Sequence, residues 1–248
     1  MKVFFHEDFY RVYDDDPAAE AGRMESVVRA LAGRVTFLAP EPAREDDILA
    51  VHPPAHVQCV RDQGLYEIAA LAAGGALAAA RLGMAEPAFA AVRPPGHHAS
   101  PDRAWGFCHF NNMAVALMAL HRDGAIRTAY LLDFDLHYGD GNVNCLGPQG
   151  FVAIHNPDTT SRSEYLARVQ RELDSSRADV YAVSAGFDNH LRDWGGVLAT
   201  EDFHAMGRMV RAAARRRNAG CFGVLEGGYN HSVLGENVLA FLQGLEQD

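Results

Sequence analysis

The sequence has few of the features that mark secreted or membrane-bound proteins. Its four cysteines are scattered with no close pair, so neither a disulfide framework nor a cysteine-based zinc site is expected. No apolar run reaches the roughly twenty residues that a membrane-spanning helix needs, and the N-terminus turns polar too early for a signal peptide. We therefore expect a protein of the cytoplasm with no membrane contact.

Positive charge is also scarce. The formal net charge is −10, and the one basic run, residues 215–217, stands where a helix is expected to end and where it complements the helix dipole. Binding to nucleic acid needs a basic surface, so the composition excludes this class of partner. An acidic surface instead favours encounters with cationic substrates.

Length and strand signals indicate a single α/β domain over residues 1–248. Seven apolar runs without strict alternation suit strands that are covered on both faces. The predicted strands are 3–6, 35–38, 89–93, 128–134, 151–155, 180–187 and 221–225. The predicted helices are 18–31, 63–82, 112–122, 164–175, 201–218 and 232–245. This alternation predicts a three-layer α/β/α sandwich with a mainly parallel central sheet.

One predicted helix contains an unusual stretch, residues 69–80, that is rich in alanine and glycine. Small side chains let a helix approach its neighbours closely. We therefore interpret this stretch as a packing surface and not as a ligand site.

Polar side chains gather at the ends of four predicted strands. The segments are 93–98, 133–141, 184–188 and 225–229. In an open parallel sheet, ligands bind beyond the carboxyl ends of the strands. We expect these four segments to meet on one rim of the sheet.

The segment 133–141 carries the pattern Asp-x-Asp-x-His. Side chains alternate faces along an extended strand, so Asp133, Asp135 and His137 are expected to project to the same side. A catalytic zinc site takes three oxygen or nitrogen ligands from the protein and leaves one position for water. Asp188, at another strand end, would complete such a set with Asp135 and His137. The pattern alone would also suit calcium or magnesium.

A hydrolytic metal site of this kind needs two further groups, a general base and an oxyanion donor. Two aspartates cancel the formal charge of Zn²⁺, so its water should be acidified less than in a site of three histidines. His97 and His98 are the candidate bases, and Asp133 and Asp140 are the carboxylates available to orient them. Tyr229, which follows two glycines at the fourth strand end, can donate a hydrogen bond to the oxyanion.

These motifs resemble those of the histone deacetylase and acetylpolyamine amidohydrolase superfamily, which shares the arginase/deacetylase fold. The similarity extends from about residue 45 to the C-terminus and rests on residues 93–99, 106–112, 133–141, 184–188 and 226–229. The resemblance implies a zinc ion, or iron in its place, held by Asp135, His137 and Asp188. It also implies hydrolysis of an N-acyl amide, first of all N-acetyl, on a small-molecule or peptide amine.

The resemblance assigns the remaining site residues as well. It implies two histidine–aspartate pairs, namely His98 with Asp140 as the main general base and acid, and His97 with Asp133. Tyr229 would polarise the substrate carbonyl. Gly106 and Phe107 would line the tunnel that holds the alkyl chain of the substrate.

Three positions depart from the family pattern. Only residues 156–163 follow His155 before the next helix, whereas most members carry a long glycine-rich loop with aromatic residues there, so half of the tunnel wall is expected to be missing. Ala153 replaces a serine that many members use to bind a structural potassium ion. Without that serine, backbone groups and the strand 133–137 would have to hold the ion. Gly195 replaces the glutamate that polyamine-selective members of one branch carry. Selectivity for polyamines through that glutamate is therefore not expected, and the opening of the substrate tunnel should be wide.

Two other functions stay open on the sequence. A ureohydrolase of the same fold would use two manganese ions, but it needs further bridging aspartates, and Gly186-Phe187-Asp188 supplies one. A non-catalytic, metal-bearing module that binds an acylated ligand has the shortened tunnel wall as its only support. The sequence indicates no particular amine, acyl length or oligomeric state.

Overall fold

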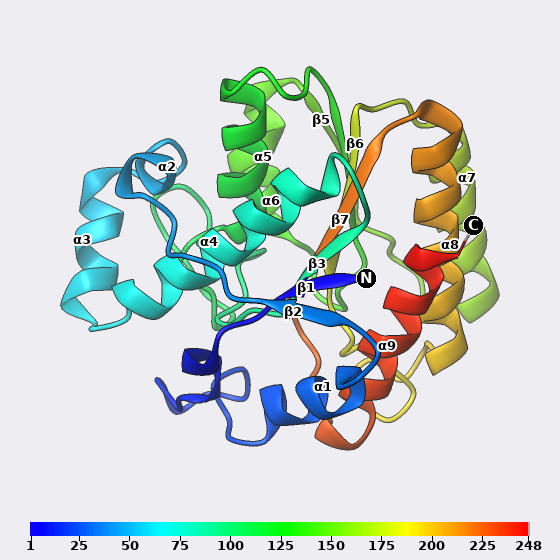
Figure 1. Ribbon diagram of the computed structural model, residues 1–248, viewed down its shortest axis with the longest axis horizontal. Coiled ribbons are helices and arrows are strands. Elements are labelled where there is room, and N and C mark those ends of the chain that lie inside the picture. Colours follow the sequence, from blue (N-terminus) through cyan, green and yellow to red (C-terminus); the bar gives the residue numbers. More distant parts are fainter. Residues whose placement is uncertain (248) are drawn as a thin grey trace.

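Seven strands form one sheet in the computed structural model, which describes residues 1–247 (Figure 1). The strands are β1 (Lys2–Phe4), β2 (Thr36–Leu38), β3 (Ala88–Ala90), β4 (Ala129–Asp133), β5 (Val152–His155), β6 (Val180–Ala185) and β7 (Gly220–Leu225). Their order is β2-β1-β3-β7-β6-β4-β5, and every neighbouring pair is parallel. The predicted α/β class and all seven predicted strands are confirmed, with ends that differ by at most three residues.

Helices cover both faces of this sheet and complete the predicted three layers. The helices are η1 (Glu7–Tyr10), α1 (Arg23–Leu31), α2 (Glu45–Leu49), α3 (Pro54–Asp62), α4 (Tyr66–Gly83), α5 (Asn112–Arg122), α6 (Asp140–Leu146), η2 (Gly147–Gln149), α7 (Arg162–Ser175), α8 (Thr200–Arg217) and α9 (His231–Glu246). Figure 1 shows α2 to α6 on one side of the sheet and α1 with α7 to α9 on the other. α4 packs on β1, β3 and β7, while α8 packs on β6, β7 and α9. Among the described helices, none is both long and apolar enough to cross a membrane.

Some helix predictions were wrong or missing. The helix predicted from residue 18 begins only at Arg23, because Gly22 has a φ of 91°, a left-handed conformation that an α-helix excludes. No helix was predicted over α2, α3 or α6. These three helices have five, nine and seven residues, too few for a helical period of apolar residues to stand out.

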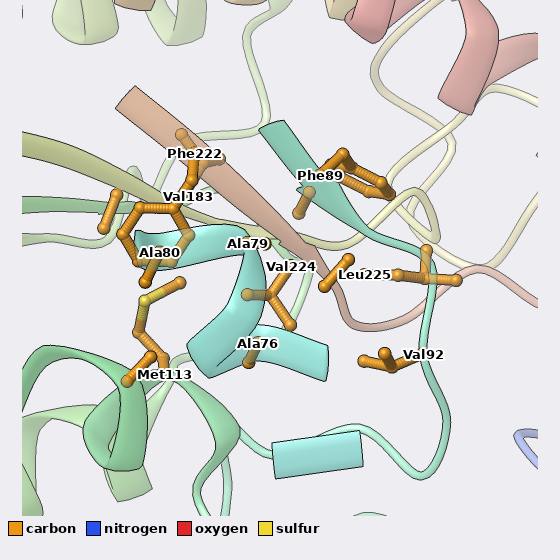
Figure 2. Packing of buried hydrophobic residues seen from close by; sticks show 14 of the residues in the cluster. Ala76, Ala79, Ala80, Phe89, Val92, Met113, Val183, Phe222, Val224 and Leu225 are labelled. Carbon is orange, nitrogen blue, oxygen red and sulfur yellow. The ribbon is translucent and has the colours of Figure 1, made fainter. Parts of the chain in front are cut away.

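The small residues of α4 pack closely, as predicted. A Cβ atom on Gly74 would lie 2.0 Å from the carbonyl oxygen of Glu41, and one on Gly75 would lie 2.6 Å from Cγ1 of Val92. Figure 2 shows the alanines of α4 among side chains of the sheet, including Ala76, Ala79, Ala80, Phe222 and Val224. The helix can therefore lie against both the sheet and the chain before α2.

The sheet order determines where the polar segments meet. β3, β7, β6 and β4 are consecutive neighbours, and all run in the same direction. Each of the four ends within three residues of one of the polar segments found in the sequence. The carboxyl edge of the sheet therefore collects these segments from four adjacent strands.

Candidate active site

Asp135, His137 and Asp188 converge beyond the ends of β4 and β6. One possible ligand atom from each of these side chains lies within 4.8 Å of the other two. Both aspartates are buried. Within the described part of the chain, the Oδ2 atom of Asp188 makes no well-aligned hydrogen bond, although His137 Nδ1 lies 3.2 Å from it. A buried carboxylate oxygen without a well-aligned hydrogen bond is costly unless a cation faces it. Two oxygens and one imidazole nitrogen therefore fit a divalent cation such as Zn²⁺.

The backbone of this segment is bent and does not continue the strand. β4 ends at Asp133, so the predicted extended geometry through His137 is wrong. The amide of His137 donates to Asp135 Oδ1 at 2.9 Å, and the amide of Leu136 donates to Asp188 Oδ1 at 3.1 Å. Because these amides donate to carboxylates and not to a neighbouring strand, the chain turns away from the strand direction after Asp133. These bends, and not the pleat of a strand, bring the two side chains to one place.

Two glycines let the backbone lie against these carboxylates. A Cβ atom on Gly186 would lie 1.9 Å from Asp135 Oδ2, and one on Gly227 would lie 2.7 Å from Asp188 Oδ2. The amide of Gly227 also donates to Asp135 Oδ2 at 2.8 Å. The loops after β6 and β7 thus form a close cradle around the possible ligands.

The cluster concentrates buried negative charge. Burial and the charge of Asp135 raise the pKa of Asp188 to about 6. Close contacts with the carboxylates of Asp135 and Asp188 raise the pKa of His137 to about 10. Both shifts show that the two carboxylates repel each other and attract any positive charge within reach. A divalent cation would neutralise both.

Each adjacent histidine contacts its own aspartate. His97 Nδ1 lies 3.3 Å from Asp133 Oδ2, and His98 Nδ1 lies 2.7 Å from Asp140 Oδ1. Asp133 also accepts a hydrogen bond from Asn142 at 2.9 Å. The structure therefore brings together the two histidine–aspartate pairs that the family resemblance implies.

The environments of the two histidines differ. Burial and the neighbouring His97 lower the pKa of His98 to about 4. Burial would lower the pKa of His97 as well, but the Asp135 and Asp133 carboxylates outweigh it and raise that pKa well above its usual value. Titratable neighbours whose pKa values are pushed apart are typical of acid–base sites.

Tyr229 lies on the loop after β7 and faces two aromatic residues. Its ring stacks on Trp194 with a centroid distance of 4.1 Å and meets the edge of Phe107 at 5.9 Å. Burial and the charges of Asp135 and Asp188 raise its pKa, so the hydroxyl keeps its proton. The hydroxyl can therefore act as a hydrogen-bond donor near the carboxylate cluster.

Gly106 and Phe107 lie on a loop that is pressed against His98. Both have left-handed backbone, with φ of 59° and 67°. A Cβ atom on Gly106 would lie 2.4 Å from His98 Cδ2, so only glycine permits this approach. The left-handed conformation of Phe107 is uncommon for a non-glycine residue, and such backbone is frequent at functional sites.

The residues that hold these loops carry no catalytic motif in the sequence. Glu226 Oε2 accepts the amides of Gly96 and His97 at 2.7 and 3.2 Å. The buried Arg23 of α1 donates to the carbonyl oxygens of Glu226 and Gly228. Arg23 lies outside the region of family resemblance, and no local pattern distinguishes it from other helical arginines.

Two tryptophans, also missed in the sequence, border the site. Trp105 stacks on His98 with a centroid distance of 3.8 Å, and Trp194 stacks on Tyr229 and meets the edge of His137 at 6.0 Å. Each tryptophan is 53% exposed. In the sequence, their position beside the recognisable motifs was the one signal that they border the site.

A groove of about 600 Å³ borders the site on the side of Trp105 and Phe107. Both aromatic residues line it, together with Asp14, Asp16 and the pair of Asp102 with Arg103, whose charged groups lie 3.9 Å apart. The groove therefore joins the aromatic wall of the candidate site to an acidic surface.

Comparisons with known proteins agree with these features. The family model of the histone deacetylase domain matches residues 59–156 and 146–245. A probable deacetylase of Methanothermobacter thermautotrophicus is 29% identical, over 98% of this chain and 90% of the relative. A histone deacetylase-like amidohydrolase of Pseudomonas aeruginosa is 29% identical, over 92% and 78%. The human polyamine deacetylase HDAC10 is 26% identical, over 99% of this chain and 48% of the relative.

A solved structure shows the same fold. The crystal structure of the HDA15 HD domain superposes with a TM-score of 0.85 at 22% sequence identity. The match covers 98% of this chain and 88% of that domain. The three-layer arrangement around a parallel sheet is therefore shared along nearly the whole chain.

Proposed function

This chain belongs to the histone deacetylase family, and from that membership we propose that it hydrolyses the amide of an N-acyl amine, first of all an N-acetyl amine. Relatives are named deacetylases and amidohydrolases, which supports an enzyme that acts on acylated small molecules or peptides. The observation that carries the proposal is the convergence of Asp135, His137 and Asp188 within 4.8 Å. In this proposal residues 1–248 act as one catalytic domain.

Asp135, His137 and Asp188 would hold the metal ion, for which we propose zinc, with iron(II) as the alternative. When bound, the ion supplies Lewis-acid polarisation of the amide carbonyl and acidification of water. The two carboxylates provide its charge balance. The cradle formed by Gly186 and Gly227 would keep their oxygens in place.

His98 would act as general base and then as general acid. Its Nδ1 atom is bound to Asp140 at 2.7 Å, which leaves Nε2 to accept a proton from water and to return one to the leaving amine. Because its pKa is lowered to about 4, the imidazole is neutral before the reaction and can accept that proton. Asp140 would stabilise the imidazolium that follows.

Tyr229 would donate a hydrogen bond to the carbonyl oxygen as negative charge develops on it. Its raised pKa keeps the hydroxyl protonated, and its stacking on Trp194 limits the freedom of the ring. Gly106 and Phe107 would line the passage for the alkyl chain. His97 would be oriented by its contact with Asp133.

The proposal is tested by replacing Tyr229→Phe in the zinc-loaded protein. Turnover of acetyl-lysine peptides, acetylated diamines and longer acyl-lysines is measured with and without a chelator. Loss of one oxyanion donor should lower kcat by about 10²- to 10³-fold without unfolding the protein. The matched control is Tyr138→Phe, an exposed tyrosine that should keep its activity.

Three outcomes would contradict parts of the proposal. Full activity of Tyr229→Phe would exclude its role as oxyanion donor. Binding of a hydroxamate without turnover of any substrate in the panel would favour a non-catalytic binder. Two manganese ions per chain in metal analysis would favour a ureohydrolase.

A further inference from the structure

We propose that Trp105 is a positioning residue that holds the Asp140 carboxylate and, through it, the ring of His98. The contacts of Trp105 with Asp140 and His98 are seen in the structure, whereas their effect on turnover rests on the proposed function. Trp105 is not among the groups that sequence analysis or the family resemblance assigned to the site.

The contacts of Trp105 form a closed triangle. Its indole Nε1 donates to Asp140 Oδ1 at 3.1 Å and to Oδ2 at 2.9 Å. Its ring stacks on His98 at 3.8 Å with an interplanar angle of 29°. His98 and Asp140 are themselves joined at 2.7 Å. One side chain therefore contacts both members of the histidine–aspartate pair.

The second pair in the site shows why such a contact matters. Asp133 is buried, and Asn142 donates to it at 2.9 Å, so its carboxylate is held by the protein interior. Asp140 is 32% exposed at the first position of α6, where water can compete for its oxygens. Trp105 donates to the exposed carboxylate as Asn142 donates to the buried one. Both aspartates thereby keep one orientation towards their histidines.

The backbone of the loop that carries Trp105 lies close to His98. The left-handed Gly106 brings the backbone so close to His98 that a Cβ atom there would clash. This places the preceding residue over the imidazole ring. Of the residues with large aromatic rings, tryptophan offers an N–H at its edge while its face covers the neighbour. Phenylalanine would keep the stacking but lose the donor.

The hydrogen bond can be tested without any catalysis. The chain has two tryptophans, so its NMR spectrum has two indole N–H signals, which Trp105→Phe and Trp194→Phe assign. Asp140→Asn removes the charge from the acceptor and should shift the Trp105 signal upfield while the Trp194 signal stays. Asp102→Asn, an exposed aspartate of the same loop, should shift neither. A Trp105 signal that does not respond to Asp140→Asn overturns the proposal.

A kinetic cycle tests whether Trp105 acts through Asp140. Trp105→Phe should lower kcat about tenfold with little change in KM, since one charge-assisted hydrogen bond is lost. The double variant Trp105→Phe with Asp140→Asn should be no slower than Asp140→Asn alone. Trp105→Ala, which also removes the stacking, should be slower than Trp105→Phe.

Other results separate the possible failures. A higher KM at unchanged kcat would make Trp105 a substrate wall, and losses that multiply in the double variant would make it independent of Asp140. A lower melting temperature at unchanged kcat would make its role purely structural. Each of these overturns the proposal. If the wild-type protein hydrolyses nothing, the proposed function fails, and the NMR experiment alone decides whether Trp105 positions the pair.

Discussion

Two buried carboxylates of the candidate site repel each other. Asp135 and Asp188 are buried together, and burial with mutual repulsion raises the pKa of Asp188 to about 6. His137 contacts both, at 3.3 and 3.2 Å, but one imidazole cannot neutralise two carboxylates. Unfavourable charge in the folded protein is therefore relieved when a divalent cation binds. The residues proposed to hold the metal should therefore cost stability without it.

Replacement of Asp188→Asn separates these two effects. In chelator-treated protein the variant should be at least as stable as the wild type, because one buried charge is gone while the Leu136 amide keeps an acceptor. The wild type should gain about 2.7 kcal/mol when zinc is a hundredfold above its Kd, and the variant should lose most of that gain. Urea unfolding with zinc or with chelator measures both quantities.

A second buried aspartate serves as the control. Asp47 is buried but is paired with Arg44 and Arg122, away from the site. Asp47→Asn should lower stability equally with and without zinc, because it breaks an ion pair and leaves the metal ligands intact. If Asp188→Asn keeps the full gain from zinc, Asp188 is not a ligand.

The packing of helix α4 depends on its lack of large side chains. Thirteen of its eighteen residues are buried, and most of them are alanine or glycine. A helix with this composition cannot fill space with large side chains and must approach its neighbours closely. The segment before α2 therefore runs directly over Gly74, and Val92 lies over Gly75.

Gly74→Ala is expected to destabilise the protein by about 1 to 3 kcal/mol, since its Cβ would lie 2.0 Å from a backbone oxygen that cannot easily move. This outcome opposes the gain of about 1 kcal/mol that alanine normally brings to a helix. The control is Gly147→Ala, whose φ of −55° is helical and whose Cβ would meet nothing within 4 Å. Chemical unfolding compares the two. Equal stability of Gly74→Ala and wild type would show that the contact is looser than described.

Over the whole molecule the charge distribution is strongly negative. The net charge is −10, and the groove beside Trp105 and Phe107 carries Asp14, Asp16 and Asp102. Asp14 and Asp16 accept hydrogen bonds from the backbone amides of Asp15 and Ala19, whereas Asp102 lies 3.9 Å from Arg103. Asp14 and Asp16 therefore give the groove an excess of negative charge. A field of this sign attracts cations to the site and does so less as salt screens it.

The proposed enzyme should therefore favour cationic substrates in a salt-dependent way. For a monoacetylated diamine, kcat/KM is expected to fall several-fold between about 20 mM and about 500 mM salt, because the Debye length shortens to a few ångströms. For a neutral N-acetyl alkylamine of the same length, kcat/KM should hardly change. Steady-state kinetics with both substrates makes the comparison. Equal salt dependence would show that the acidic field does not reach the incoming substrate.

The sequence by itself determined the α/β class, the seven strands and the four segments that carry polar residues to one rim. These features depend on local patterns, since apolar runs and the residues that directly follow them need no distant partner to be recognised. The short helices α2, α3 and α6 lacked such a pattern. The geometry beyond Asp133 was predicted wrongly because its amides bind carboxylates of the site.

Only the tertiary structure decided how the site is supported. It showed that Asp188 Oδ2 makes no well-aligned hydrogen bond among the described residues, that Arg23 holds the loop after β7, and that Trp105 contacts both His98 and Asp140. Arg23 and the carbonyl groups it binds are more than two hundred residues apart in the chain. Contacts of this kind arise when the sheet brings distant loops together, and no sequence period records them.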